Sequence, residues 1–447
     1  MQSAVAAGSR GTVDVALQIL TQGGNAVDAA VAAGLAMPVT EPGLGSLGGG
    51  GFMMVRQPDG ETRLLDFFAA VPSRRGEQMT VVTVEFPGAR QDFEVGAGSV
   101  AVPGVLAGLV HAHTTFGRLP WSRIVDAALA GIRDGCVLTA KQEELLGLVD
   151  AVLRLTPESA AVFAPGGRQL REGDLLVNED YVAFLEGMRD APGQLPAVGP
   201  LVAEDLAAYR VFEREPLRVA LPGATVVTNP PPSLGGSIIA YALAELAHVD
   251  HPTAADLLAA LRDATEHNKA TPPVSVRGTT HISVTDGRQV VAMTVSNGSN
   301  SGVMLPGTGV QLNNMMGESD LHPDGHTVVP GERIRSMMAP SLVERGGVVT
   351  ALGSGGSERI RSALVRVISA LIRDTGLQQA IDSPRVHLDN EGVVQVEPGF
   401  PREQVEQLPL PLSQWHARDF YFGGVHAVTT AGEAAADARR GGHTGRA

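Results

Sequence analysis

The sequence predicts a mixed α/β (α+β) fold, in which short β-strands alternate with alanine-rich helices. Three observations lead to this prediction. Apolar residues recur at helical spacing in several separate segments, apolar and polar residues alternate strictly within residues 278–302, and the chain contains no internal repeat. A chain of 447 residues can bury a substantial core, either as one large domain or as two.

The first predicted elements are two helices. Helical spacing predicts one helix that Thr12 caps and Gly23-Gly24 ends, and a second helix that Asn25 caps. The small residues on the second helix favour close packing. Pro38 and Pro42 then predict an irregular loop. The positions that carry these helical stripes are Val13, Ala16, Leu17 and Leu20, followed by Val27, Ala30, Val31 and Gly34.

A glycine-rich segment follows, and its residues 43–48 match the dinucleotide-binding pattern G-x-G-x-x-G. That pattern holds a pyrophosphate only when a strand leads into it and a helix leaves it. Here a loop leads in, glycines 48–51 are a poor helix start, and the residues beyond them predict a β-hairpin that turns at residues 58–60. We therefore expect glycine packing in this segment, and neither a nucleotide nor another cofactor.

The remaining predicted helices lie in three segments. Residues 105–135 predict two helices separated by Gly117 and Pro120, and further helices are expected within 253–270 and 362–376. The segment 271–278 has two prolines and no helical pattern, so it predicts an exposed, cleavable connection. The Arg- and Gly-rich end of the chain, residues 436–447, is expected to be a mobile tail.

Composition narrows the function classes. The net charge of −14 and the lack of Lys/Arg clusters argue against a nucleic-acid partner, and no apolar run is long enough for a membrane span. With Cys136 as the single cysteine and no secretion signal, the simplest expectation is a cytoplasmic protein. The histidine pairs 111/113 and 248/251 lack a third ligand nearby, so we expect no metal.

The segment 278–302 predicts an antiparallel hairpin that turns at Asp286-Gly287. If Ile282 and Val284 share the buried face with Val291 and Met293, each even-numbered residue of the first strand pairs with an odd-numbered residue of the second. Thr279 must then lie opposite Thr294 or Ser296, and either partner places a second hydroxyl about 5 Å away between Cβ atoms. Thr–Thr pairs also simply stabilise sheets, so the pairing alone does not assign a function.

A functional reading of Thr279 requires a cut in front of it. A threonine hydroxyl is a weak nucleophile until a base removes its proton. If Thr279 became an N-terminus, its own α-amine, with a pKa near 8, would be that base. Before the cut, the same hydroxyl could attack the preceding carbonyl of Gly278 in an N-to-O acyl shift.

These residues, and motifs along almost the whole chain, resemble the γ-glutamyltranspeptidase family of N-terminal nucleophile hydrolases. The resemblance implies a four-layer αββα sandwich made of two intertwined subunits, 1–278 and 279–447, which arise by self-cleavage between Gly278 and Thr279. It implies Thr279 as nucleophile, Ser296 as the hydroxyl that orients it, and Gly355 and Gly356 as backbone donors of the oxyanion hole. The motifs that carry it are GGNAVDAAVAAGLAMPVTEPGLGSLGGGGFMMV, SVAVPGVLAGLVHAHTTFGRLPW, NPPPSLGGS, GTTHISVTDG, PGTGVQLNNMM, MMAPSLV, ALGSGGSERIRSA and GGVHAV.

The chain departs from the family pattern where the substrate binds. Members that handle γ-glutamyl groups hold the α-carboxylate with an arginine in a D-F-R-type motif, and here Phe68 takes that place in LDFFAAVP. Phenylalanine supplies neither charge nor a bidentate hydrogen bond, and Arg74 or Arg75 is the nearest substitute. Met315 replaces a common polar contact, and only Ser336 remains of the usual serine pair. The resemblance also assigns substrate binding to Asn297 and to Glu318, the acid that would hold a substrate amine.

The leading hypothesis is therefore a self-processed enzyme that cleaves an amide or acyl bond of a small molecule other than glutathione, through an acyl-enzyme. One alternative is a C–C bond-cleaving hydrolase acting on an alkylproline precursor in lincosamide- or pyrrolobenzodiazepine-type antibiotic biosynthesis. Others are an ordinary γ-glutamyltransferase and a processed but inactive binding protein. The expected partners are the small-molecule substrate and the chain's own two fragments. The sequence leaves the acceptor and the oligomeric state open.

Overall fold

The computed structural model describes residues 2–74, 79–86, 89–268, 278–318, 321, 329–389, 391–409 and 411–447. The predicted cleavable connection, 271–278, lies outside these ranges except for Gly278. Helices and strands are both abundant, so the predicted mixed α/β fold is confirmed. In the described ranges, no helix combines the length and apolar character that crossing a membrane requires.

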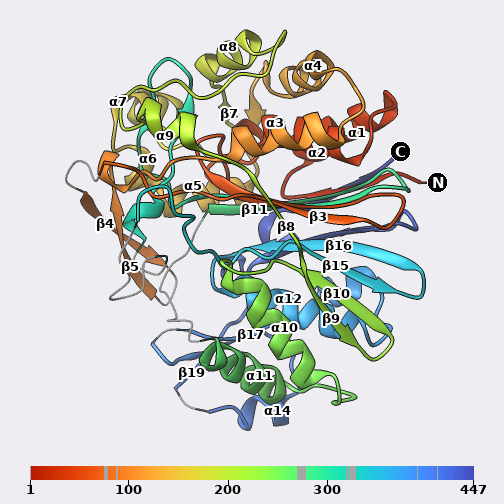
Figure 1. Ribbon diagram of the computed structural model, residues 1–447. Coiled ribbons are helices and arrows are strands. Elements are labelled where there is room, and N and C mark those ends of the chain that lie inside the picture. The colour runs from red at the N-terminus through yellow and green to blue at the C-terminus, as the bar shows by residue number, and fades with distance from the viewer. Residues whose placement is uncertain are drawn as a thin grey trace.

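Two large sheets form the centre of the described structure (Figure 1). Their faces contact each other through β11, β16 and β20. The first sheet has the strand order β22 (His443–Arg446), β1 (Ala4–Ala7), β11 (Gly278–Thr285), β12 (Val290–Gly298), β2 (Gly50–Arg56), β3 (Thr62–Phe67), β8 (Phe212–Arg214). The second has the order β21 (Ala434–Ala436), β20 (Gly424–Thr429), β16 (Val348–Gly355), β15 (Ser341–Arg345), β10 (Ala224–Thr228), β9 (Leu217–Leu221).

Helices cover the outer faces of both sheets (Figure 1). Outside the first sheet lie α1 (Arg10–Thr21), α2 (Ala26–Thr40), α3 (Val105–Phe116) and α4 (Trp121–Ile132), with α5 (Ala140–Leu148), α6 (Asp150–Leu153), α7 (Pro157–Phe163), α8 (Glu179–Gly187) and α9 (Ala203–Ala208) around them. Outside the second lie α10 (Leu234–Leu246), α11 (Ala254–His267), α12 (Arg359–Leu371), α13 (Leu377–Ile381) and α14 (Arg402–Glu406). One apolar core lies between α1–α4 and the first sheet, and a second surrounds the other sheet and α10–α12.

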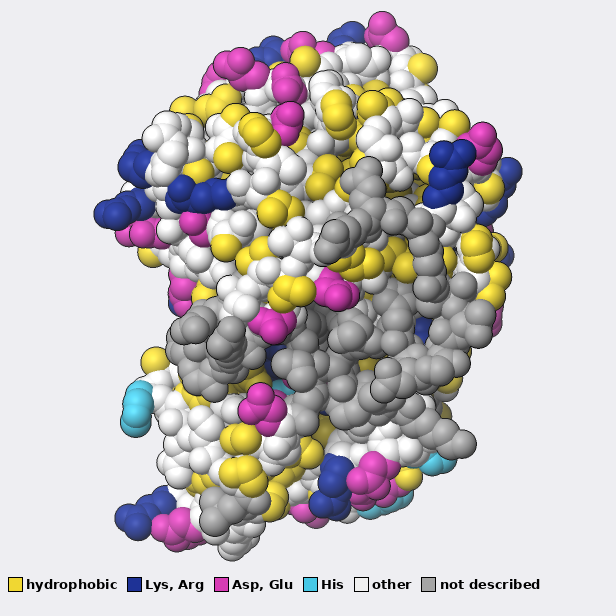
Figure 2. Space-filling model, turned by 90° about the vertical axis from the view of Figure 1, so that its left-hand side faces the viewer, with side chains coloured by type: hydrophobic (Ala, Val, Ile, Leu, Met, Phe, Trp, Pro, Cys, Tyr) yellow, Lys and Arg dark blue, Asp and Glu magenta, His cyan; other side chains and the backbone are white. Residues whose placement is uncertain are grey.

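The described residues also form smaller sheets. They are β4 (Thr80–Phe86) with β5 (Ala89–Val95), β6 (Cys136–Val137) with β7 (Leu175–Leu176), β13 (Met304–Leu305) with β14 (Val310–Gln311), and β17 (Val386–Leu388) with β18 (Val394–Val396) and β19 (Leu412–Gln414). Figure 2 shows the side of the molecule that carries β4 and β5. On this side, basic and acidic side chains are interspersed among apolar ones.

The helix α2 is longer than the sequence predicted. It begins with the expected cap, because Asn25 and Asp28 bond each other's backbone N–H in a capping box. It then continues through Pro38 to Thr40, so the predicted loop at Pro38 is wrong. Almost every side chain of α2 is buried, and tertiary packing outweighs the loss of one helical hydrogen bond.

The glycine-rich segment connects this helix to β2. Its predicted role in packing fits the structure, since a Cβ on Gly48 or Gly49 would approach a backbone oxygen of Gln311 or Ser296 to 2.2 or 2.3 Å. The segment leads from a helix into a strand, the reverse of the dinucleotide-binding order. The hairpin predicted to turn at residues 58–60 is formed by β2 and β3.

The end of the chain is not a mobile tail, which corrects the prediction. β22 pairs with β1 at the edge of the first sheet. Just before it, Arg439 is 3 % exposed and donates to both oxygens of Glu397 at 2.6 Å. Asp437 accepts from Arg439 and Arg385, and all four of these side chains are buried. The composition of 436–447 suggested solvated charge, but Asp437 and Arg439 are buried, and each has a buried partner contributed by distant sequence, Arg385 and Glu397 respectively.

Candidate active site

Thr279 lies at the start of β11, directly opposite Ser296 of β12. Ile282 pairs with Met293 and Val284 with Val291, as parity required, and these apolar side chains face α1–α4. Of the two partners that parity allowed, Thr294 pairs instead with His281. The other face of β11 packs against the second sheet, so Thr279 is only 2 % exposed.

The Ser296 hydroxyl connects the predicted nucleophile to the predicted scissile bond. Its Oγ accepts from the Thr279 Oγ1 at 3.1 Å and from the Gly298 N–H at 3.1 Å, and it donates to the Gly278 carbonyl oxygen at 2.9 Å. The strand register slips at this point, because Gly278 pairs with Gly298 while Thr279 pairs with Ser296. The resulting bulge brings the Gly278 carbonyl within reach of the Ser296 hydroxyl.

A small hollow of about 10 Å³ opens beside these hydroxyls, which is room for about one water centre. It brings together five of the residues that the sequence singled out, namely Phe68, Thr279, Ser296, Glu318 and Ser336. The rest of its lining is Met315, Leu321, Met337, Met338, Ser357 and Ile360. Asn297 lies outside this lining: its amide Nδ2 donates to Asn300 Oδ1 and to the Leu312 carbonyl.

Of the glycines predicted as oxyanion donors, Gly355 ends β16 against the backbone of Thr279, and Gly356 follows directly after the strand. A Cβ added to Gly355 would lie 2.1 Å from the Thr279 carbonyl oxygen. Gly356 has φ of 126°, which side chains rarely adopt, and Ser357 has φ of 55°. Ser357, which sequence reasoning missed, lines the hollow with Thr279. A non-glycine residue in the left-handed region is typical of sites where the surrounding structure imposes a conformation.

Phe68, at the position where the family resemblance predicts an arginine, is held firmly. Its ring stacks on Phe52 with centroids 5.5 Å apart, and it is 2 % exposed. Its carbonyl accepts from Arg333 Nη1 at 2.6 Å and from the Tyr209 hydroxyl at 2.8 Å. Arg333 therefore binds the backbone here, and Arg74 is exposed. Arg75 lies outside the described residues.

Glu318 is the acidic side chain of the lining. It is 4 % exposed, and its Oε1 accepts from the Ser299 N–H at 3.1 Å. Ser336, on the other side, accepts from the Met338 N–H at 3.0 Å. Both side chains are thus held in place by backbone groups, while their outer surfaces contribute to the hollow.

Glu41, at the end of α2, is a buried carboxyl that sequence reasoning missed. Its Oε2 accepts from the hydroxyl of Thr280, the residue that follows the predicted nucleophile. Burial raises the pKa of Glu41, although hydrogen bonds from Thr12 and Thr280 act in the opposite direction. The sequence does contain a signal that could have singled out Glu41, because it is the single charged residue between Asp28 and Arg56.

The face of β11 between the two sheets is unusually polar. His281 Nδ1 lies 2.8 Å from Thr294 Oγ1, and its Nε2 lies 2.8 Å from Ser283 Oγ. Burial lowers the pKa of His281 well below its usual range, so the ring is neutral at neutral pH. A Cβ on Gly353 would lie 2.3 Å from the His281 ring. Gly353 and Gly355 therefore give β11 the space to carry polar side chains on this face.

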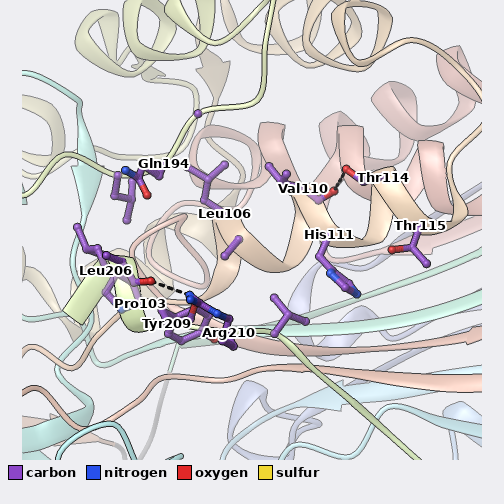
Figure 3. A pocket seen from close by; sticks show the side chains of 15 residues that line it. Pro103, Leu106, Val110, His111, Thr114, Thr115, Gln194, Leu206, Tyr209 and Arg210 are labelled. Carbon is purple, nitrogen blue, oxygen red and sulfur yellow. Dashed lines mark hydrogen bonds between the residues drawn. The ribbon is translucent and has the colours of Figure 1, made fainter. Parts of the chain in front are cut away.

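A larger cavity of about 620 Å³ lies between α3 and residues 193–211, away from the hydroxyl pair (Figure 3). Its walls are mainly apolar, with Leu106 and Val110 on the helix. Some of its polar side chains bond to the protein itself, for example Arg210 Nη1 to the carbonyls of Ala207 and Tyr209. We place the candidate active site at the smaller hollow, because the predicted nucleophile Thr279 and the hydroxyl of Ser296 that bonds it lie there.

Comparisons with known proteins identify the family of the chain. The family described as gamma-glutamyltranspeptidase matches residues 12–195 and 251–446. The chain is 31 % identical over 484 aligned positions to the acylase ACY 1 proenzyme of Pseudomonas sp. strain SE83, covering 90 % of this chain and 87 % of that protein. It is 28 % identical over 494 positions to the glutathione hydrolase proenzyme of Escherichia coli K12, covering 91 % and 84 %.

A solved structure supports the fold. The cephalosporin acylase from Bacillus halodurans superposes with a TM-score of 0.80 at 23 % identity, covering 99 % of this chain and 95 % of that one. The family match spans most of the chain, and the curated relatives are enzymes that align over most of their own length. The chain is thus an enzyme of the gamma-glutamyltranspeptidase family, within the N-terminal nucleophile hydrolases.

Proposed function

We propose that this protein is a self-cleaving amidohydrolase with Thr279 as its nucleophile, acting on a small molecule whose acyl group is largely apolar. The observation that carries the proposal is the Ser296 hydroxyl, which bonds both the Thr279 hydroxyl and the Gly278 carbonyl. The names of the curated relatives, an acylase and a glutathione hydrolase, support amide-bond hydrolysis.

Self-cleavage begins with attack of Thr279 Oγ1 on the Gly278 carbonyl carbon. The new C–O bond forms first and gives a tetrahedral intermediate, whose collapse breaks the C–N bond as the proton of the Thr279 hydroxyl passes to the α-nitrogen. The Ser296 hydroxyl, already donating to the Gly278 carbonyl oxygen, stabilises the oxyanion of the tetrahedral intermediate. Water then hydrolyses the ester, which leaves Gly278 with a carboxylate and Thr279 with a free amine.

This cut yields the two proposed subunits, 1–278 and 279–447, which share both large sheets in the four-layer αββα arrangement of the superfamily. In turnover, the Thr279 amine accepts the hydroxyl proton while Oγ1 attacks the substrate carbonyl. The same proton then passes to the departing amine. The backbone N–H groups of Gly355 and Gly356 are the proposed donors to the oxyanion, and water completes the cycle by hydrolysing the acyl-enzyme.

The lining of the hollow supports an apolar acyl group. Phe68 fills the place of the arginine that holds a γ-glutamyl carboxylate in related enzymes, and Arg333 is engaged with the Phe68 backbone. Glu318 is positioned for a cationic amine of the substrate. The apolar surface around Thr279 comes from Phe68, Met315, Leu321, Met337, Met338 and Ile360. A buried carboxylate without an arginine would lose a charge-assisted pair, so glutathione is disfavoured.

The experiment compares the wild-type protein with Thr279→Ala. On a denaturing gel the wild type should give two fragments and the variant one uncut chain. Purified wild type should hydrolyse an apolar acyl anilide at least about 100-fold faster than a γ-glutamyl anilide, the size of one lost charge-assisted pair. A wild-type protein that remains a single chain would overturn the proposal, and efficient glutathione turnover would overturn its substrate class.

A second assay separates the remaining alternatives. Attack on a ketone beside a stabilised carbanion would use the same nucleophile, so an alkylproline-type ketone is included in the substrate panel. If the enzyme cleaved this ketone selectively, C–C bond hydrolysis would be the better assignment of its reaction than amide hydrolysis. Failure of an electrophilic acyl analogue to label Thr279 in processed protein would favour an inactive binding protein.

A further inference from the structure

Arg440 is a buried cation beside the predicted nucleophile, and nothing in the proposed mechanism uses it. It ends the short helix η6 (Ala438–Arg440) and is 6 % exposed. Its Nη1 lies 3.5 Å from the Thr279 carbonyl oxygen, and its guanidinium carbon lies 4.1 Å from the centroid of the Phe420 ring. A Cβ on Gly355 would come within 3.2 Å of the same Nη1. The guanidinium is therefore packed between an aromatic face and the backbone of the site.

This cation is poorly compensated, in contrast to its sequence neighbour. Arg439 has two buried carboxylates, Glu397 and Asp437. Among the described residues, no carboxylate lies within ion-pair distance of Arg440, and its Nε and Nη2 are buried without a hydrogen-bond partner. Burial lowers the pKa of Arg440 to about 9, and the nearby Arg359 acts in the same direction. A buried charge without a partner is costly, so its retention beside Thr279 calls for an explanation.

We propose that Arg440 is a positioning residue whose charge keeps the freed α-amine of Thr279 neutral, and hence able to act as the base. This inference rests on the proposed self-cleavage. The nitrogen and carbonyl oxygen of one residue are less than about 4 Å apart, so the amine lies within roughly 7 Å of the guanidinium. A positive neighbour at that range disfavours protonation of the amine. At neutral pH, a free α-amine with a pKa near 8 would otherwise be mostly protonated.

Other titratable groups face this amine from the elements packed around it. Glu318 lines the hollow and favours the protonated amine, so it opposes Arg440. Glu41 reaches Thr280 from the end of α2 and, when ionised, also opposes Arg440, although burial raises its pKa. His281, on the same strand, is neutral because burial lowers its pKa. The more distant charges are Glu358 and Arg359 at the start of α12, Arg385, Asp419 and Asp437.

The test is Arg440→Met, which removes the charge of Arg440 and keeps an unbranched apolar side chain. The acid limb of the kcat/KM profile of processed enzyme should move to higher pH by about one unit, from the Coulomb interaction at this distance. Arg440→Lys keeps a charge and should restore most of the position of the limb. Arg366→Met is the matched control, because Arg366 also stacks on a phenylalanine ring, Phe400, and donates to one carbonyl. It should leave the limb where it is.

An unmoved limb in a cleaved, active Arg440→Met enzyme would overturn the inference and reduce Arg440 to a packing role. If the Arg440→Met variant does not fold or is not cleaved, a measurement on the wild-type enzyme tests the inference instead. Cyanate reacts with neutral amines, so the pH dependence of Thr279 carbamoylation gives the pKa of the amine directly. A value about one unit below that of an ordinary α-amine supports the inference, and a value at or above 8 overturns it. A wild type without a second N-terminus would instead refute the proposed function itself.

Discussion

Gly355→Ala is the sharpest single perturbation of the site. Gly355 has no positive φ, so alanine fits the backbone conformation of this position. The obstacle is steric, because the new methyl carbon would lie 2.1 Å from the Thr279 carbonyl oxygen, and real Cβ atoms almost never approach below 3.0 Å. The blocking atom belongs to the backbone of Thr279, the proposed nucleophile, so β11 and β16 must separate by about 1 Å at this point.

A displacement of this size should lower the catalytic rate. A misplacement of about 1 Å lowers the rates of well-positioned reactions by roughly 100-fold. We expect kcat for an apolar acyl anilide to fall by about that factor, as measured in steady-state assays. Self-cleavage should slow in parallel, as measured in a gel time course. Gly187→Ala is the control, because a Cβ at Gly187, the last residue of α8, meets no atom within 4 Å.

The control should be processed and active like the wild type, with at most slightly higher thermal stability. The reasoning is wrong if Gly355→Ala matures at the normal rate and keeps kcat within threefold of the wild type. In that case, either the two sheets yield at this point at little cost or Thr279 is not the reacting residue.

Three further predictions concern neighbouring groups. Ser296→Ala removes the hydrogen-bond partner of both the Thr279 hydroxyl and the Gly278 carbonyl, so self-cleavage should slow by about 100-fold in a gel time course. An unchanged rate of self-cleavage would contradict the proposed role of Ser296 in this step. Glu318→Gln should raise KM by about tenfold or more for substrates that carry an amine while leaving amine-free substrates unaffected, which steady-state kinetics with a matched substrate pair would reveal. Burial alone would raise the pKa of Asp437, but Arg385 and Arg439 outweigh burial and hold the pKa at about 2. The ionised Asp437 side chain therefore stabilises the fold by about 2 kcal/mol above pH 4, and this stabilisation is lost as the pH falls from 4 to 2. The difference in Tm between wild type and Asp437→Asn should therefore narrow over that range, and a constant difference would contradict the assignment.

Local rules predicted the elements around the site well. The β11–β12 hairpin follows from alternation and one turn, and parity left two partners for Thr279, of which Ser296 is the observed one. The cap at Asn25 and the break between α3 and α4 follow from residues whose preferences act within one helical turn. Proline was misleading at Pro38, because burial of the whole helix outweighs its local penalty.

Features that depend on distant partners were not predictable from local pattern. The end of the chain resembled a solvated tail, yet Asp437 and Arg439 meet Arg385 and Glu397 only after the second sheet has formed. The interaction of Glu41 with Thr280 joins residues 239 positions apart. The polar layer around His281 depends on the close approach of Gly353 from another sheet. Each of these contacts is set by how elements distant in sequence pack together, which no single segment encodes.

Intact-mass analysis with N-terminal sequencing of the purified, active enzyme bears most directly on whether a chain break creates the catalytic group. We expect two polypeptides, the second beginning Thr-Thr-His, and a mass increase of one acyl group on that second chain after brief exposure to substrate. An active enzyme that remains one continuous polypeptide, or an adduct on the first fragment, would contradict this expectation.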